Sequence, residues 1–471
     1  MSTISVRILI FALFLSEQFQ LFSSEELCSF SKSKLKCMCR YQAQPNTPFP
    51  VHSADCTRMS LTEFPKDTHL PSVEDLDLSR NLISTLDHDH NNFESVLLRF
   101  LNLSFNKIAY LFQDFFINTP NLSVLDLSHN EIVYLSNANV FRGLGNLTVL
   151  KLSFNKLSTL PEDVFRPLKN LEELDLRFNY LGVTLMQHSS FFQLSMGFPR
   201  NISKLNLDGV GISKLPNGYF DEGSHLKYLS LSDNPLTEIP LVSSIVEHLD
   251  LSGTHITTVS GKHLPYQSLK VLKLNRLKRL EEIEHYAFLN LKSLEELHLS
   301  DSKRLRSLPN LAFGILSNDT EVTLKRMHIS RTGIRTLNST YLHLFKKVKF
   351  VDLQHNPWDC KCEILWLQQL NGSLHRYDNI RCLTPRNLRT KKIMSLSDKD
   401  MPDCFNSYAN VQKTLIGIFS ILVALLCLLI LYLLYLGPFH PPKTRGVGPG
   451  SPYQSISLEI DPCKAEDASR N

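Results

Sequence analysis

Apolar and polar positions follow a short phrase that recurs along the chain between residues 73 and 357. In its clearest copies it reads apolar-x-x-Leu-x-Leu-x-x-Asn-x-apolar, as from Leu122 to Ile132 and from Leu147 to Leu157. Nine of the eleven steps between copies measure 20 to 25 residues, and two measure 30 or 31, which predicts a solenoid of stacked coils. The twelve coils begin at Val73, Leu98, Leu122, Leu147, Leu171, Ile202, Leu226, Val246, Leu269, Leu294, Leu324 and Val348.

Each copy predicts one short β-strand with one buried face. Leu125 and Leu127 alternate with Asp126, so a strand would turn both leucines inward and leave the carboxylate in solvent. Asn130 follows, where a buried side-chain amide can satisfy backbone groups that a curved coil leaves unpaired. Stacked copies make a parallel sheet on the concave side of an arc. The expected fold class is therefore an α/β solenoid, the leucine-rich-repeat horseshoe.

Phenylalanine recurs after the strand in most coils, often following a Leu-Pro pair such as Leu160 and Pro161. We expect these rings to form the second wall of the core and assign them no direct role in function. They are Phe93, Phe116, Phe141, Phe165, Phe220, Phe288, Phe313 and Phe345.

Two clusters of cysteines flank the repeats. Cysteines spaced two apart cannot readily pair with each other, so each is expected to reach a more distant partner. A zinc site is the alternative, but disulfides are favoured in a secreted domain. The clusters are Cys28, Cys37, Cys39 and Cys56 before the repeats, and Cys360, Cys362, Cys382 and Cys404 after them.

The run from Asn356 to Cys362, Asn-Pro-Trp-Asp-Cys-Lys-Cys, is followed by Trp366 and Leu367. It resembles the disulfide-bonded caps of extracellular leucine-rich-repeat proteins, and the resemblance extends over residues 28–404. The resemblance implies an adhesion or receptor type of protein without a Toll-type signalling domain. It also implies four disulfides: Cys28–Cys39, Cys37–Cys56, Cys360–Cys382 and Cys362–Cys404.

Two hydrophobic segments predict the topology. A short apolar run follows Arg7 and precedes Ser23 and Ser24, which is typical of a cleaved signal peptide over residues 1–24. Residues 414–436 contain no charged residue and are long enough to cross a bilayer. We therefore expect a single-pass type I protein of the plasma membrane with an extracellular ectodomain. The remaining expected parts are an N-terminal cap (25–60), repeats (61–357), a C-terminal cap (358–405), a juxtamembrane segment (406–413) and a disordered cytoplasmic tail (437–471).

Seven Asn-x-Ser/Thr sequons support this orientation, because none lies in the tail. Asn121, Asn146 and Asn201 each directly precede the first apolar residue of a coil, so their glycans would line one flank. Asn102 lies between Leu101 and Leu103, and a glycan there would obstruct the N-terminal part of the concave face. The predicted glycosylation sites are Asn102, Asn121, Asn146, Asn201, Asn318, Asn338 and Asn371.

Catalytic constellations are absent from the sequence: it has no Gly-x-Ser-x-Gly, no His-Glu-x-x-His and no phosphate loop. His88 and His90 could ligate a metal, but a solvated turn is the favoured interpretation. The formal net charge is +4 and 20% of the residues are charged, and the sequence contains no run of basic residues of the kind that binds nucleic acids. We expect no enzymatic activity, no cofactor, no catalytic or metal site, and no nucleic-acid partner.

The exposed columns of the concave sheet and its margin are candidate binding surfaces. The third position of the phrase carries Phe100, Val124 and Val149, and the eighth carries Phe105, Phe154 and Phe178. Aromatic rings in neighbouring coils make a candidate apolar contact strip. The alternative is that the eighth-position rings pack against one another as part of the solenoid margin.

The second half of the repeats carries basic residues on the same face, where an acidic protein surface or a sulfated glycan could dock. Glu295, Glu296 and Asp301 interrupt this patch, which favours a self-compensated polar surface as the alternative. The basic residues are Lys273, Arg276, Lys325, Arg326, His328 and Arg331.

Two further segments carry hypotheses. The insertion 183–199 in the fifth coil contains Phe191, Phe192 and Phe198, and it could be a protruding contact loop or a locally packed bulge. In the tail, Tyr453 and Ile456 match the tyrosine-x-x-bulky pattern of a sorting motif.

These observations leave the binding of a partner, rather than catalysis, as the expected function. We predict a cell-surface leucine-rich-repeat glycoprotein that binds an extracellular protein ligand or a cell-surface protein, as a receptor or in cell adhesion, and contacts the lipid bilayer through one helix. One alternative is an auxiliary subunit of a channel or larger receptor in the same membrane. Another is a membrane-tethered ligand trap.

Overall fold

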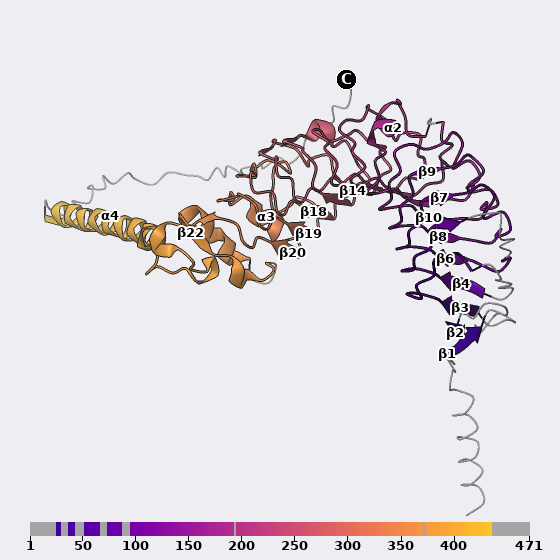
Figure 1. Cartoon of the computed structure of the whole chain (residues 1–471). Helices are drawn as coiled ribbons and strands as arrows, with labels where there is room; N and C mark the ends of the chain where they lie inside the picture. The colour runs from indigo at the N-terminus through magenta and orange to yellow at the C-terminus, as the bar shows by residue number, and fades with distance from the viewer. Residues whose placement is uncertain are drawn as a thin grey trace, which may run out of the picture. The chain divides into compact units, whose positions relative to one another are not determined.

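The computed structural model describes residues 25–29, 36–42, 51–65, 73–86, 95–192, 195–370 and 374–435. The chain forms two units, Met1–Cys404 and Phe405–Asn471. The predicted signal peptide, the cytoplasmic tail with Tyr453 and Ile456, and the residues His88, His90, Phe93 and Asn371 lie outside the described residues. Figure 1 shows the strands of the first unit stacked side by side.

One sheet of 15 strands forms the spine of the first unit. Its first two pairings are antiparallel, and β3 and all later neighbours are parallel. Each of the twelve predicted phrases contributes one strand, which confirms the leucine-rich-repeat fold class. The strands are β1 (Glu25–Ser29), β2 (Lys36–Gln42), β3 (Val51–Asp55), β4 (Val73–Asp77), β6 (Phe100–Asn102), β8 (Val124–Asp126), β10 (Val149–Lys151), β11 (Glu173–Asp175), β12 (Lys204–Asn206), β13 (Tyr228–Ser230), β14 (His248–Asp250), β16 (Val271–Lys273), β18 (Glu296–His298), β19 (Arg326–His328) and β20 (Phe350–Asp352).

The other strands and α-helices of the repeats are short, and in the sequence they lie between the strands of the main sheet. Two-residue strands form small parallel ladders of their own, and two five-residue helices occur in the fifth coil and before the last repeat. They are β5 (Thr85–Leu86), β7 (Tyr110–Leu111), β9 (Tyr134–Leu135), β15 (Thr258–Val259), β17 (Glu282–Ile283), α2 (Gly182–Met186) and α3 (Tyr341–Phe345). A pair of strands, β21 (Trp358–Asp359) and β22 (Cys382–Thr384), belongs to the C-terminal cap.

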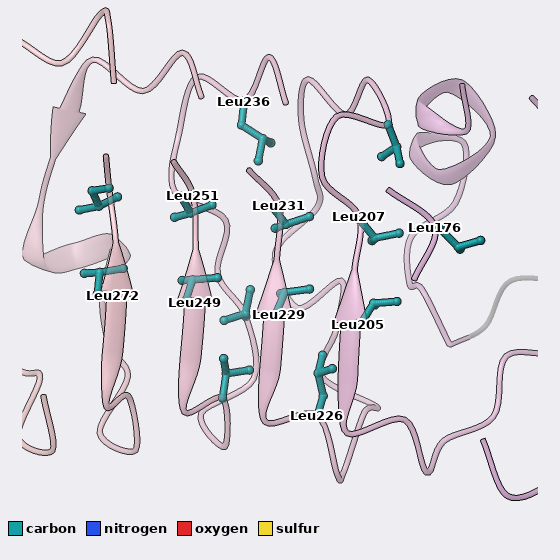
Figure 2. Close-up of a cluster of buried hydrophobic side chains, with 14 of the residues drawn as sticks. Leu176, Leu205, Leu207, Leu226, Leu229, Leu231, Leu236, Leu249, Leu251 and Leu272 are labelled. Atoms are coloured by element: carbon teal, nitrogen blue, oxygen red, sulfur yellow. The ribbon is translucent and has the colours of Figure 1, made fainter. Parts of the chain in front are cut away.

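Strand pairing is in register, so equivalent leucines meet across the coils. Leu205, Leu229 and Leu249 are direct partners in adjacent strands. Figure 2 shows them in one row with Leu272, and Leu207, Leu231 and Leu251 in a second row. All are buried, and burial of a leucine side chain stabilises a fold by about 1.5–3 kcal/mol.

A ladder of asparagines closes the turn after the strands. Nδ2 of Asn130 donates to the carbonyls of Leu103, Leu127 and Ser128, and its Oδ1 accepts from the amide of Ile108. Asn81, Asn106, Asn155 and Asn179 make the same kind of bonds in their own coils. The predicted role of this position is confirmed, because each amide satisfies backbone groups that the curved chain leaves without partners.

Phenylalanine rings form the second wall of the core as predicted. Phe116, Phe141, Phe165, Phe220 and Phe345 are fully buried, and Phe288 is almost so. Phe313 is only partly buried, although it packs against the core.

The insertion 183–199 is a locally packed bulge rather than a protruding loop. Phe191, Phe192, Met196 and Phe198 are buried, and the Phe191 and Phe198 rings stack at 4.3 Å. The Phe198 ring also stacks on Phe165 at 4.7 Å. The inserted residues therefore enlarge the core of the fifth coil.

Disulfides lie at both ends of the repeats. Described pairs are Cys37–Cys56, Cys360–Cys382 and Cys362–Cys404, which are the pairs that the resemblance implied. Cys39 is also disulfide-bonded, whereas the side chain of Cys28 lies outside the described residues. Trp358 and Trp366 are buried in the C-terminal cap, where their ring nitrogens donate to the carbonyls of Leu353 and Leu337.

The second unit contains most of one long helix, α4 (Pro402–Tyr435). Its segment Gln412–Tyr435 has a mean hydropathy of 3.0 and is long and apolar enough to cross a membrane. The large apolar side chains of this segment are exposed, as lipid-facing side chains would be. The helix overlaps the span predicted at 414–436.

Candidate recognition surface

The eighth residue of each coil follows the concave strand and has a left-handed backbone. The φ angle is 54° at Phe105, His129 and Phe154 and 53° at Phe178. A left-handed backbone is unfavourable for a residue with a side chain by about 1–2 kcal/mol, and Gly, Asn and Asp tolerate it best. Later coils place Gly209, Asp233, Gly253, Arg276, Asp301, Arg331 and His355 there.

In the first half of the solenoid the eighth-position side chains form one continuous stack. The Phe105 ring lies 4.0 Å from His129, His129 lies 4.2 Å from Phe154, and Phe154 lies 4.6 Å from Phe178, all between ring centroids. The guanidinium of Arg80 covers the other face of Phe105 at 4.5 Å. We call these five side chains the aromatic margin: Arg80, Phe105, His129, Phe154 and Phe178.

The aromatic margin remains open to solvent despite this stacking. Phe105, Phe154 and Phe178 are 41%, 36% and 39% exposed. Partial burial lowers the pKa of His129, which the Asp126 carboxylate opposes. The imidazole is therefore neutral at physiological pH, and the surface offers flat rings with Arg80 at one end and the Arg177 guanidinium 5.7 Å from the centroid of the Phe154 ring.

Three of these five side chains, the phenylalanines, were predicted from the sequence. Arg80 and His129 were not, because only phenylalanines were considered at the eighth position. Both could have been found from the register of the repeat, since a cation or an imidazole at the same position of a neighbouring coil can join a stack of phenylalanine rings. The rings pack on one another, as the second interpretation predicted, and they also stay exposed, whereas their role as a contact strip stays a prediction.

The third-position residues Phe100, Val124 and Val149 are brought together on the concave face. They are direct partners in β6, β8 and β10, and each is half-buried. Apolar side chains thus continue from the aromatic margin onto the sheet in the same coils.

Basic residues of the second half are ion-paired across the coils. The Arg276 guanidinium donates two bonds to Asp233 at 2.9 and 3.0 Å, and Arg331 donates two to Asp301 at 2.6 and 3.2 Å. Lys273 lies 3.6 Å from Asp250, Lys325 lies 2.7 Å from Glu295, and Arg326 lies 3.7 Å from Glu296. The structure thus matches the self-compensated alternative for this patch.

His328 belongs to a different stack within the concave sheet. Its ring lies 4.3 Å from His298 and 4.8 Å from Phe350. Burial, followed by the charge of His298, lowers the pKa of His328 to about 4. His328 is therefore neutral at physiological pH and adds no positive charge to the patch.

Predicted glycosylation sites occupy two kinds of position. Asn121, Asn146 and Asn201 are exposed, and each Nδ2 donates to a carbonyl of the preceding coil, at 2.7, 3.0 and 3.5 Å. Asn318 and Asn338 are exposed later in the chain. Asn102 lies in β6, where its Nδ2 donates to Asp77 at 3.0 Å.

This architecture defines a leucine-rich-repeat solenoid with disulfides at both ends. Residues 137–181 and 200–256 match the family model described as leucine rich repeat, and residues 257–352 match the one described as BspA type leucine rich repeat region. The chain is a member of the extracellular leucine-rich-repeat superfamily.

Three known proteins illustrate the relationship. Trophoblast glycoprotein of Macaca fascicularis is 24% identical over 288 residues, covering 50% of this chain and 61% of the relative. Tsukushi of Gallus gallus is 30% identical over 169 residues, covering 35% of this chain and 43% of the relative. A chain of the mouse RP105/MD-1 complex has a TM-score of 0.53 at 25% identity, covering 72% of this chain and 53% of that chain. This chain therefore spans about half the length of these proteins.

Proposed function

We propose that this protein is a non-enzymatic cell-surface receptor or adhesion protein that binds an extracellular protein partner through the aromatic margin. It would span the plasma membrane once, through the apolar segment Gln412–Tyr435 of α4, with the repeats outside. The observation that carries the proposal is the solvent-exposed stack from Arg80 to Phe178.

Backbone strain supports a role for these rings. Bulky residues at left-handed positions are unfavourable, and four other coils fill the same position with glycine or aspartate, although Arg276, Arg331 and His355 occupy it in three more. Mutual stacking recovers about 0.5–1.5 kcal/mol per ring pair, which is similar to the strain. Folding alone therefore gives little reason to prefer phenylalanine over asparagine at this position.

The chemistry of the surface suits a protein partner. Rigid aromatic side chains and arginine are enriched among the residues that dominate protein–protein binding energy. The neighbouring RP105/MD-1 structure is itself a complex of two proteins. A glycan at Asn102 would obstruct the concave sheet beside Phe100, so the partner would approach the margin.

The first test is proximity labelling on intact cells with the full-length protein and Phe154→Asn. Asparagine tolerates the left-handed backbone, so we expect normal folding and loss of the extracellular neighbours. Tyr286→Asn is the matched control, because Tyr286 is also an aromatic residue at positive φ, 45% exposed, outside the aromatic margin.

A third protein, with residues 414–436 replaced by an unrelated membrane segment, separates the alternatives. If the variant with the replaced membrane segment keeps the same labelled neighbours, recognition by the ectodomain is supported. If the neighbours are lost only in this variant, the auxiliary-subunit hypothesis is favoured instead. Retention of all neighbours by Phe154→Asn would refute the aromatic margin as the binding surface.

A further inference from the structure

An open pocket of about 650 Å³ lies beside the second half of the sheet, in the turns that follow β13, β14, β16 and β18. Its wall includes both acidic and basic side chains. Its lining residues include Asp233, Gly253, Arg276, Lys278, Arg279, Asp301 and Lys303.

The acidic side chains of this pocket are already neutralised. Asp233 accepts both bonds from Arg276, which reaches it across Gly253. Asp301 accepts both bonds from Arg331. Neither carboxylate is therefore left to balance the remaining cations of the pocket.

Three cations in the pocket wall make no ion pair with any part of the chain that the structure describes. They are Lys278, Arg279 and Lys303, and all three are exposed. This separates them from Lys273, Arg276, Lys325, Arg326 and Arg331, each of which has an acidic partner. The pocket therefore gathers three cations that have no acidic partner among the described residues.

A one-residue insertion in two consecutive coils creates this cluster. In most coils the last apolar residue of the repeated phrase comes two residues after the ninth position, as Leu157 comes after Asn155. In coils nine and ten the equivalent apolar residue comes three residues after the ninth position. These residues are Leu280 and Leu305, and both are buried. The longer turns present the same dipeptide, Lys278-Arg279 and Lys303-Arg304, at equivalent positions.

A second small hollow continues the basic surface. It is lined by Glu281, Arg304 and Arg306. Arg304 donates to Glu281 at 3.0 Å, whereas Arg306 makes no ion pair among the described residues. The cations are therefore arrayed along two neighbouring coils rather than focused on a point.

We propose that this basic pocket binds a sulfated polysaccharide. A linear chain with anionic groups at intervals matches cations that repeat from one coil to the next. The pocket wall offers no phenylalanine, tyrosine, tryptophan or large aliphatic side chain. It therefore lacks the large aromatic and apolar anchors that protein partners use, and His255 is the one ring among its lining residues on which a base could stack.

This site is separate from the aromatic margin and goes beyond the proposed function. The nearest coil of the aromatic margin is the fifth, whereas the unpaired cations lie in coils nine and ten. Either proposal can fail without the other, because the two tests use different residues and different probes.

The experiment measures binding of heparin to the full-length protein in detergent micelles at near-physiological salt. The triple variant Lys278→Ser, Arg279→Ser, Lys303→Ser should bind heparin at least about tenfold more weakly, with a shallower salt dependence. The matched control removes three exposed cations elsewhere that make no ion pair within the described part of the chain, Lys107→Ser, Lys169→Ser and Arg389→Ser, and should stay within about twofold of the wild type.

A gain-of-charge variant covers the case of a misfolded triple variant. Glu281→Gln frees Arg304 from its carboxylate partner and should strengthen heparin binding by about two- to threefold. Desulfated heparin should bind poorly to the wild type. The proposal is overturned by equal losses in the triple variant and its control, by equal binding of desulfated heparin, or by tighter binding of a single-stranded oligonucleotide.

Discussion

The two halves of the solenoid use the same backbone position in opposite ways. In the first half, the left-handed eighth residues carry flat rings that stack from Phe105 to Phe178. In the second half, Asp233 pairs with Arg276 across Gly253, and Asp301 pairs with Arg331. One column of the repeat is thus apolar over several coils and ionic over several others.

The glycines show how the backbone permits both arrangements. A Cβ at Gly209 would lie 2.6 Å from the ring of Phe178, which covers that position at the end of the stack. A Cβ at Gly253 would collide with Asp233 and crowd Arg276. The repeat therefore fixes where side chains emerge, and the residue types in each half decide what the surface can bind.

The largest expected effect tests what the two halves share. Leu150→Asp and Leu297→Asp place an unpaired charge in the same inward row of β10 and β18, where both leucines are fully buried. Each should lower the free energy of unfolding by at least about 4 kcal/mol. Surface expression and thermal unfolding of the full-length protein would measure the effect.

Lys151→Ser and His298→Ser are the controls, because both residues are next to these leucines and face the other side of the sheet. We expect both control proteins to reach the surface. Tolerance of the aspartate in only one half would show that the two halves do not share one continuous core.

Alanine at the two glycines should have a smaller effect. Gly209→Ala and Gly253→Ala each introduce left-handed strain of about 1–2 kcal/mol together with a steric conflict. Gly211→Ala is the control for strain alone, because φ is 94° there and no atom lies within 4 Å of the added carbon.

Denaturant unfolding of double variants would assign each conflict to its partner. Phe178→Asn should relieve Gly209→Ala, and Asp233→Ala should relieve Gly253→Ala, each down to the cost of the Gly211→Ala control. Full additivity in either pair would mean that the glycine and its neighbour do not interact in that half.

The periodic pattern of the sequence was enough to predict the strands and the asparagine turns, whereas the cysteine pairs now described were implied by the resemblance to extracellular leucine-rich-repeat proteins. The strands and turns depend on a residue and its equivalents at a fixed spacing, so the local sequence is enough to predict them. Phe100 and Val124, for instance, are neighbours simply because they share the third position.

Contacts that cross the coils at the margin were harder to predict. Whether Arg276 was free or paired depended on Asp233, which lies 43 residues earlier and two coils away. The uncompensated Lys278 and Lys303 were missed for the same reason, because they stand out only once the pairs of their neighbours are known. The sequence shows which residues are charged, whereas the fold determines which of them form ion pairs.

The smallest expected effect compares two half-buried imidazoles, those of His328 and His129, under acid. The pKa of His328 is lowered to about 4 by burial and then by the charge of His298, whereas an unfolded histidine has a pKa near 6.5. Between these values the unfolded chain binds more protons than the folded chain. Stability should therefore fall as the pH decreases from about 6.5 to about 4.

His328→Gln should flatten this slope relative to the wild type. Because His328 is only half-buried, we expect screening to limit the gain near pH 4 to about 1 kcal/mol. His129→Gln should act in the same direction but more weakly, because the Asp126 carboxylate favours protonation of His129. Urea unfolding at several pH values would measure the stability of the wild type and of both variants. A larger effect at His129 than at His328 would mean that the first half of the solenoid, rather than the second, is the more sensitive to acid.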